Sequence, residues 1–101
     1  MLFSEVYELC KRIPKGKVST YKDIAEALDS KAYRLVGQAL RCNPYAPEVP
    51  CHRVVKVNGE IGGFKGEIEG EVVQEKVELL ESEGVKVVKG KVDLKKCLHR
   101  F

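Results

Sequence analysis

The chain lacks the features of membrane and secreted proteins. No stretch approaches the roughly 18 consecutive apolar residues that a membrane-spanning helix needs. The N-terminus also lacks the basic-then-apolar order of a secretory signal peptide. These absences predict an intracellular, cytoplasmic protein that has no membrane partner.

Cysteines are few and scattered. The four cysteines form no Cys-x-x-Cys pair, and an intracellular setting disfavours a disulfide framework. Cys51-His52 and Cys97-x-His99 contain metal-ligand types, but neighbouring residues rarely bind one ion together. Structural zinc sites also show paired ligands at short loop spacing. We therefore expect no metal site and no cofactor.

Size and charge point to one small globular domain. A chain of 101 residues buries a modest core, so a single domain over 1–101 is expected. The hydrophobic fraction of 44% and the charged fraction of 33% are typical of soluble globular proteins. Residues 1–58 contain ten lysines and arginines against six acidic residues. This excess suits a polyanion such as nucleic acid, although an ordinary solvated surface gives the same count about as often.

Apolar residues recur at helical spacing in four segments. Thr20 is placed to cap the second helix, with Asp23 at the third helical position, and Asp29-Ser30 breaks that helix. Gly84 is placed to end the fourth helix. The predicted helices span residues 4–12, a segment between Thr20 and Asp29, about 31–42 and about 69–83.

The second and third of these helices are joined by a tight polar turn. The third presents Arg34 and Arg41 away from its apolar side, which is the pattern of a helix-turn-helix, winged-helix-like DNA-binding unit. A helical hairpin that only packs gives the same pattern. Gly37 in mid-helix costs about 1 kcal/mol relative to alanine. Something is therefore expected to approach that face closely, either a neighbouring helix or a nucleic-acid backbone.

A proline-rich loop over 43–53 follows the third helix. Its prolines restrict the backbone, so the loop should be irregular yet ordered. Residues 54–61 then predict a β-hairpin with Asn58-Gly59 at its turn, followed by a glycine-rich loop over 62–66. The tail from Val85 is expected to add an extended segment and a last turn. The predicted fold class is α+β and mainly helical.

Cys51 stands between Pro50 and His52 and is a candidate nucleophile. The thiolate is the reactive form of cysteine, and a nearby base or positive charge promotes it. An inert buried thiol beside a surface histidine is the commoner fate of an isolated Cys-His pair. If His52 acts as the base, it should do so through a bridging water or a local turn, with a carboxylate behind it. Spacing leaves that carboxylate open among the nine acidic residues after position 58.

Several segments together resemble the active-site domain of methylated-DNA-protein cysteine methyltransferases, which are O6-alkylguanine-DNA alkyltransferases. Members of this family repair guanine alkylated on its exocyclic oxygen and are consumed by the reaction. The similar segments run through nearly all of the chain, and the Pro-Cys-His-Arg-Val run is highly specific among them. They are PKGKVSTY (14–21), RLVGQALRCNP (34–44), VPCHRVV (49–55), GGF (62–64), LL (79–80) and EG (83–84).

The resemblance implies a role for each catalytic residue. Cys51 would accept the alkyl group irreversibly, His52 would be its water-mediated base, and Glu83 would be the carboxylate behind that histidine. Asn43 would brace the turn between the recognition helix and the cysteine loop. Each molecule would then act once.

The resemblance also implies that a monomer binds double-stranded DNA that carries O6-alkylguanine. The base would be rotated out of the stack, which costs a few kcal/mol. Arg34 would enter the duplex where the base has left, and Tyr21 would crowd the phosphate and the extruded base. Ala32, Tyr33 and Gly37 would face the minor groove, and Arg41 is a further expected DNA-binding residue.

A substrate pocket follows from the same resemblance. Backbone carbonyls near Cys51 and Val54 would read the guanine edge. Donors from Tyr21 and the 62–66 loop would stabilise the departing oxygen. The pocket residues would be Tyr21, Leu40, Val54, Gly62, Phe64, Lys65 and Gly66.

The chain departs from the family pattern in three places. Larger members have an additional N-terminal domain, which this sequence is expected to lack. Lys65 stands at the usual hydroxyl-bearing position of the pocket loop, and Phe64 replaces a tyrosine. One group of single-domain relatives binds such lesions without repairing them and has tryptophan in place of the cysteine. Cys51 favours repair. Two alternatives remain: a non-enzymatic lesion-binding protein, and a helix-turn-helix regulator based on residues 20–42.

Overall fold

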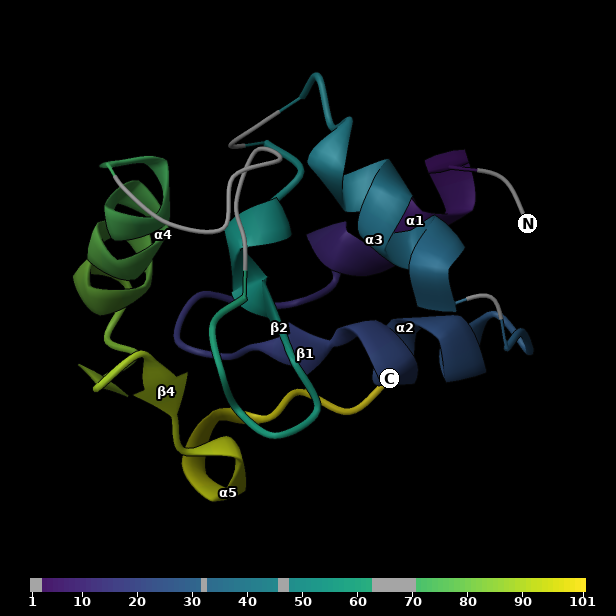
Figure 1. Cartoon of the computed structure of the whole chain (residues 1–101). Coiled ribbons are helices and arrows are strands. Elements are labelled where there is room, and N and C mark those ends of the chain that lie inside the picture. The colour runs from purple at the N-terminus through teal and green to yellow at the C-terminus, as the bar shows by residue number, and fades with distance from the viewer. Residues whose placement is uncertain (1–2, 32, 46–47, 63–70) are drawn as a thin grey trace.

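The computed structural model describes residues 3–31, 33–45, 48–62 and 71–101. In this part of the chain, helices dominate and the strands are short (Figure 1). None of these helices has the length and apolar character needed to cross a membrane. In chain order the elements are α1 (Phe3–Lys11), β1 (Ser19–Thr20), α2 (Tyr21–Ala27), α3 (Tyr33–Arg41), the 3-10 turn η1 (Cys51–Arg53), β2 (Val54–Val55), α4 (Glu71–Ser82), β3 (Val87–Val88), β4 (Lys91–Val92) and α5 (Leu94–Cys97).

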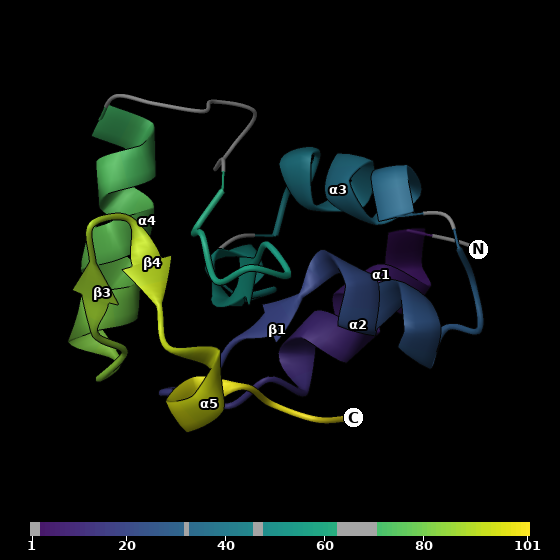
Figure 2. The ribbon, with the colours of Figure 1, turned by 60° about the horizontal axis from the view of Figure 1, so that its bottom comes forward.

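Helices α1, α2 and α3 pack against one another and enclose the first of two hydrophobic clusters (Figure 2). The apolar stripe predicted for the first helix faces this cluster, because Val6 and Cys10 are fully buried. Cys51 and Val54 join the same cluster from the chain that follows α3. The candidate nucleophile therefore lies on the wall of a packed core, which restricts its movement.

Helix α2 begins and ends at the residues that the sequence predicts. The Thr20 hydroxyl accepts a hydrogen bond from the Asp23 amide at 3.0 Å, which caps the helix. At the other end, the Ser30 amide donates to the Ala25 carbonyl at 2.9 Å, and Asp29 has a φ of 54°. Asp29 thus occupies the left-handed position that glycine usually takes, because a short polar side chain tolerates it.

Helix α4 packs against the second cluster. In Figure 1 this helix lies on the opposite side of β2 from α1 and α3. Its predicted end is confirmed: Gly84 has a φ of 90°, and the Val85 amide donates to the Leu80 carbonyl at 3.0 Å. Both Leu80 and Val85 are buried in this cluster. The second cluster comprises Val18, Val55, Ile61, Leu80, Val85, Val92 and Cys97.

The hairpin predicted over residues 54–61 is wrong except for its turn. The Gly59 amide donates to the Lys56 carbonyl at 2.9 Å, and the Lys56 amide donates to the Glu60 carbonyl at 2.8 Å. Beyond this turn, the two predicted strands pair with other segments. Strand β2 pairs in parallel with β1, whereas Glu60 forms a bridge with Lys91. Burial of Val55 in the second cluster favours this pairing, and the antiparallel hairpin of the domain is β3–β4 instead.

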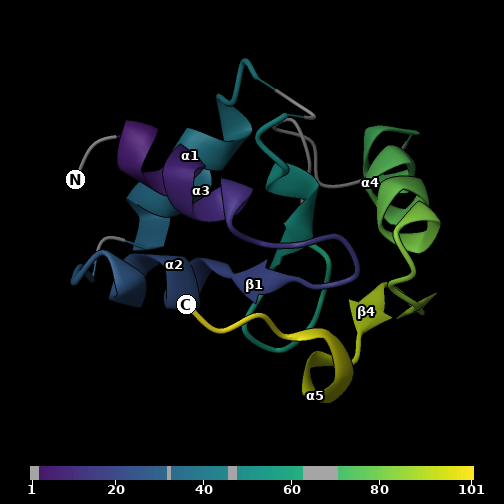
Figure 3. The same cartoon turned by 180° about the vertical axis from the view of Figure 1, so that it is seen from behind.

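The C-terminal segment passes beside the chain that leads into β1 (Figure 3). The Val18 amide donates to the Cys97 carbonyl at 2.8 Å, and the His99 amide donates to the Val18 carbonyl at 2.7 Å. Val18 is fully buried. These bonds fix the backbone just before Thr20 and Tyr21, so the end of the chain supports the start of α2.

Candidate functional site

Cys51 opens the η1 turn directly after Pro50. Its amide donates to the Val49 carbonyl at 2.8 Å, and its carbonyl accepts the amide of Val54. The residue is 7% exposed. A tight turn with both backbone groups bonded holds the thiol in one place, so an alkyl donor must be brought to it.

His52 and Glu83 lie in contact, although they are 31 positions apart in the sequence. The histidine Nε2 is 3.1 Å from both carboxylate oxygens, and His52 is 2% exposed. A carboxylate only accepts, so Nε2 carries the proton and Nδ1 keeps a lone pair when the ring is neutral. Burial lowers the pKa of His52, and together with the charges of Arg53 and Lys76 it outweighs the Glu83 carboxylate, which raises the pKa. The ring is therefore neutral near pH 7 and able to take a proton.

Arg53 completes the surroundings of Glu83. Its Nε donates to Oε1 at 2.9 Å and its Nη2 to Oε2 at 2.6 Å, while Nη1 donates to the Ile13 carbonyl at 2.7 Å. Burial raises the pKa of Glu83, but hydrogen bonds from Arg53 and His52 outweigh it and hold the pKa below its ordinary value. Glu83 is thus ionised at neutral pH. Arg53 was not among the predicted site residues, although its place next to His52 was the available indication.

Glu83 also stands at an unfavourable place in the fold. It follows the last residue of α4, where the helix dipole is negative and a second negative charge destabilises the helix end. The bidentate guanidinium of Arg53 offsets this repulsion. The pair with Arg53 thus allows a carboxylate to stand beside His52 at the end of α4.

Asn43 fastens the loop that leads to Cys51. Its amide nitrogen donates to the Val49 carbonyl at 2.9 Å, and its side-chain oxygen accepts the Tyr45 amide at 2.9 Å. One side chain thus joins the end of α3 to the residue before Pro50. This geometry limits how far the cysteine turn can move relative to α3.

Tyr21 packs against the cluster that contains Cys51. Burial raises the pKa of Tyr21, and the nearby Cys51 raises it further. The phenol therefore remains protonated at neutral pH and can donate a hydrogen bond. A Cβ placed on Gly62 would lie 3.5 Å from the Tyr21 hydroxyl, so the hydroxyl reaches the start of the predicted pocket loop.

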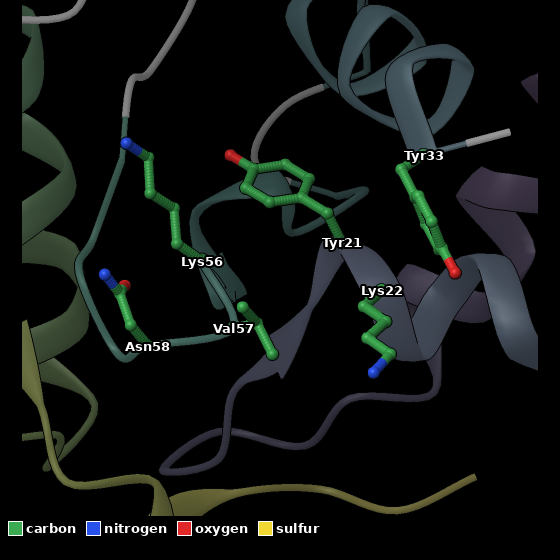
Figure 4. A pocket seen from close by; sticks show the side chains of 6 residues that line it. All are labelled: Tyr21, Lys22, Tyr33, Lys56, Val57 and Asn58. Atoms are coloured by element: carbon green, nitrogen blue, oxygen red, sulfur yellow. The ribbon is translucent and has the colours of Figure 1, made fainter. Parts of the chain in front are cut away.

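Tyr21 also forms one wall of an open cleft of about 550 Å³. Among the described residues, its lining contains two lysines and no acidic side chain. In Figure 4 the Tyr21 ring lies between Lys56 on one side and Tyr33 on the other. The lining residues are Tyr21, Lys22, Tyr33, Lys56, Val57 and Asn58.

The outer face of α3 is open. Tyr33 is 43% exposed, and Arg34 and Arg41 are also exposed. An added Cβ on Gly37 would meet no heavy atom within 4 Å among the described residues. A neighbouring helix therefore does not account for this glycine. Leu40, by contrast, points inward and is buried in the cluster with Cys51.

The predicted pocket includes Val54 and the backbone carbonyls of Cys51 and Val54. Val54 is buried, and its carbonyl accepts a hydrogen bond from Lys76 Nζ at 2.8 Å. The carbonyls of Cys51 and Val54 thus each accept a hydrogen bond from within the protein. Lys76 was missed by the sequence analysis. The remaining predicted site residues, Ala32, Phe64, Lys65 and Gly66, lie outside the described residues.

The chain is similar to known DNA alkyltransferases. A family model described as 6-O-methylguanine DNA methyltransferase, DNA binding domain, matches residues 1–85. A methylated-DNA--protein-cysteine methyltransferase of Thermococcus kodakarensis is 49% identical over 83 residues, which cover 81% of this chain and 44% of the relative. A bifunctional methyltransferase/endonuclease of Picrophilus torridus is 38% identical over 99% of this chain and 32% of the relative. The chain thus spans less than half of each of these two proteins.

A solved structure is similar along nearly the whole chain. It is S. pombe Atl1 in complex with damaged DNA containing O6-carboxymethylguanine, with a TM-score of 0.85 and 30% sequence identity. The similarity covers 98% of this chain and 94% of that one. It therefore includes the C-terminal hairpin and α5, which follow the segment matched by the family model.

Within the described residues, no group of three or more histidine, cysteine, aspartate or glutamate side chains is placed to hold a metal ion.

Proposed function

Because the chain belongs to the 6-O-methylguanine DNA methyltransferase family, we propose that it repairs DNA by transferring an alkyl group from O6 of guanine to Cys51. The observation that carries this proposal is the contact of a neutral His52 with an ionised Glu83 beside the cysteine turn. The histidine supplies a base and the carboxylate fixes its tautomer. Arg53 holds that carboxylate in place.

The reaction is a single displacement. His52 takes the thiol proton through a water molecule, and the Cys51 sulfur attacks the alkyl carbon. The carbon–sulfur bond forms as the bond between that carbon and O6 breaks, and the electron pair stays on the guanine. Tyr21 donates a hydrogen bond to the departing oxygen. The thioether has no return path, so one molecule repairs one base.

DNA binding uses the open face of α3. Arg34 takes the space of the rotated base, and Gly37 lets the DNA backbone approach the helix closely. Support for this arrangement comes from the exposure of Arg34 and the empty space beside Gly37 among the described residues. Asn43 then keeps α3 and the cysteine turn in a fixed relation.

The test is the intact mass of the protein after incubation with a duplex oligonucleotide that contains O6-methylguanine. We expect a gain of one methyl group, found on the peptide that contains Cys51. Cys51→Ala should show no gain, and the control Cys42→Ala, at an exposed cysteine, should react normally. An unmodified wild-type protein, under conditions where a known alkyltransferase reacts to completion, would exclude the proposal.

A second candidate function is lesion binding without transfer. It is motivated by the similarity to Atl1 over nearly the full length of both chains. This function predicts tighter binding to lesion DNA than to intact DNA, with no mass gain. Cys51→Ala should then bind lesion DNA as the wild type does, and it should leave the lesion in place just as the wild type would.

A further inference from the structure

Lys76 is the most unusual buried side chain among the described residues. It lies on α4, is 1% exposed and has the largest volume of the fully buried side chains. Burying an ammonium group is unfavourable, and burial lowers the pKa of Lys76 to about 8. A leucine or methionine would fill the same space without this penalty. The lysine therefore has a use that an apolar side chain would not serve.

The ammonium group joins two segments that flank the proposed pocket. Nζ donates to the Val54 carbonyl at 2.8 Å and also to the Ile61 carbonyl. Val54 follows the cysteine turn directly, and Ile61 precedes Gly62 at the start of the glycine-rich loop. An exposed turn separates these two carbonyls in the sequence. One side chain from α4 thus fixes both edges of the pocket.

Lys76 also lies within electrostatic reach of the two reactive residues. The Cys51 thiolate favours the charged form of Lys76, and the charge of Lys76 disfavours a charged His52. The charge of Lys76 thus helps to keep the ring of His52 neutral, as a base must be.

We propose that Lys76 is a positioning residue for the acceptor cysteine: it anchors both edges of the pocket to α4 and places a positive charge near the sulfur. The inference rests on the proposed function, because it assumes that Cys51 is the acceptor. Lys76 acts through Val54, Ile61 and Cys51, with no contact to the substrate.

The first test measures how Cys51 reacts with iodoacetamide, a small electrophile that requires no DNA. Labelling of the Cys51 peptide at pH 7 is followed by mass spectrometry in wild type, Lys76→Met and Lys76→Arg. We expect Lys76→Met to react about tenfold more slowly, because both edges of the pocket lose their anchor and the sulfur loses the nearby charge. Lys76→Arg retains the charge and should restore most of the rate. The matched control is Lys86→Met, at an exposed lysine, which should match the wild type.

A folded Lys76→Met protein with the wild-type labelling rate would overturn the inference. If that variant does not fold, a measurement on the wild type decides. Lysine labelled with 13C at Cε reports the titration of Lys76 by NMR before and after Cys51 is alkylated. Alkylation removes the thiolate, so the pKa of Lys76 should fall, and an unchanged value would contradict the proposal. Neither measurement uses alkylated DNA, so a failure of the proposed repair function is recognised separately.

Discussion

At the scale of single residues, Glu83 connects catalysis with stability. Glu83→Gln keeps the shape of the side chain but removes the charge that Arg53 and His52 share. We expect a loss of about 2 kcal/mol in the free energy of unfolding, because the guanidinium keeps little solvent contact and loses its partner. Alkyl transfer to Cys51 should also slow. Denaturant unfolding at pH 7 measures the first effect, and Glu81→Gln, at an exposed acid in the last turn of α4, should change neither.

His52 and Glu83 predict two separate windows of acid instability. The pKa of His52 is lowered in the folded protein, so the unfolded chain binds a proton first as the pH falls below about 6.5. The pKa of Glu83 is lowered as well, so the stability from its carboxylate is lost only below about 4.5. We expect the melting temperature to fall in the upper window in the wild type. In His52→Gln the melting temperature should fall less in the upper window, while its fall in the lower window should be unchanged.

The matched control for this pH dependence is the second histidine. His99 lies in the C-terminal segment, so His99→Gln should preserve the wild-type fall in melting temperature between pH 6.5 and 4.5. An equal fall in His52→Gln would mean that other groups cause the acid instability. Circular dichroism melts across this range are sufficient for the measurement.

Single residues also show where sequence reasoning succeeds and where it stops. The Cys51-His52 pair was recognisable because adjacent residues need no fold to meet. Glu83 was assigned only through resemblance, since no spacing rule links positions 31 apart. Lys76 was missed although it lies at helical spacing from Val73 and Leu80, so a lysine on an apolar stripe was the available indication. Its partners are backbone carbonyls, which leave no pattern in a sequence.

At the scale of elements, α3 offers a test that separates stability from function. Gly37→Ala should raise the free energy of unfolding by about 0.5 to 1 kcal/mol, because alanine favours a helix and the space beside Gly37 is open among the described residues. The same methyl group should weaken binding to lesion DNA, because we propose that the DNA backbone approaches there. Denaturant unfolding and fluorescence anisotropy measure the two effects.

An opposite result at Gly37 would be informative. If Gly37→Ala binds lesion DNA as tightly as the wild type, that face of α3 does not meet the duplex. A suitable comparison is Gly84→Ala, in which the left-handed φ of 90° disfavours alanine. That variant should lose stability, as expected for a residue that ends a helix.

Elements with a local cause were predicted well, and elements with a distant partner were not. The cap at Thr20 and the end at Gly84 depend on residues a few positions away, and both are where the sequence placed them. The turn at Asn58-Gly59 likewise formed. Strand β2 instead pairs with β1, 35 positions away by their register, and the hairpin lies in the tail. The pairing of β2 with β1 depends on the burial of Val55 in the second cluster. Other members of that cluster are distant in the sequence, so a local pattern does not predict the pairing.

At the scale of the whole molecule, the cleft beside Tyr21 provides a further prediction. Lys22 and Lys56 are exposed, contribute to its lining and pair only loosely with their own helix or turn, at 3.9 and 3.8 Å from Glu26 and Glu60. Such exposed pairs contribute little, so both lysines remain available to a polyanion. We expect the cleft to hold the phosphate backbone of the DNA beside the rotated base.

The variant that tests this expectation replaces Lys22 and Lys56 by glutamine together. Binding to lesion DNA should weaken, and the slope of log affinity against log salt should become shallower by about two, because about two phosphate contacts are lost. Methyl transfer from the free base O6-methylguanine should keep its rate, since a base without a backbone does not use the cleft. The double variant Lys86→Gln with Lys89→Gln, at exposed lysines on either side of β3, carries the same charge change outside the cleft. If both double variants lose affinity and slope equally, DNA binding reflects net charge alone, and the cleft has no special part in it.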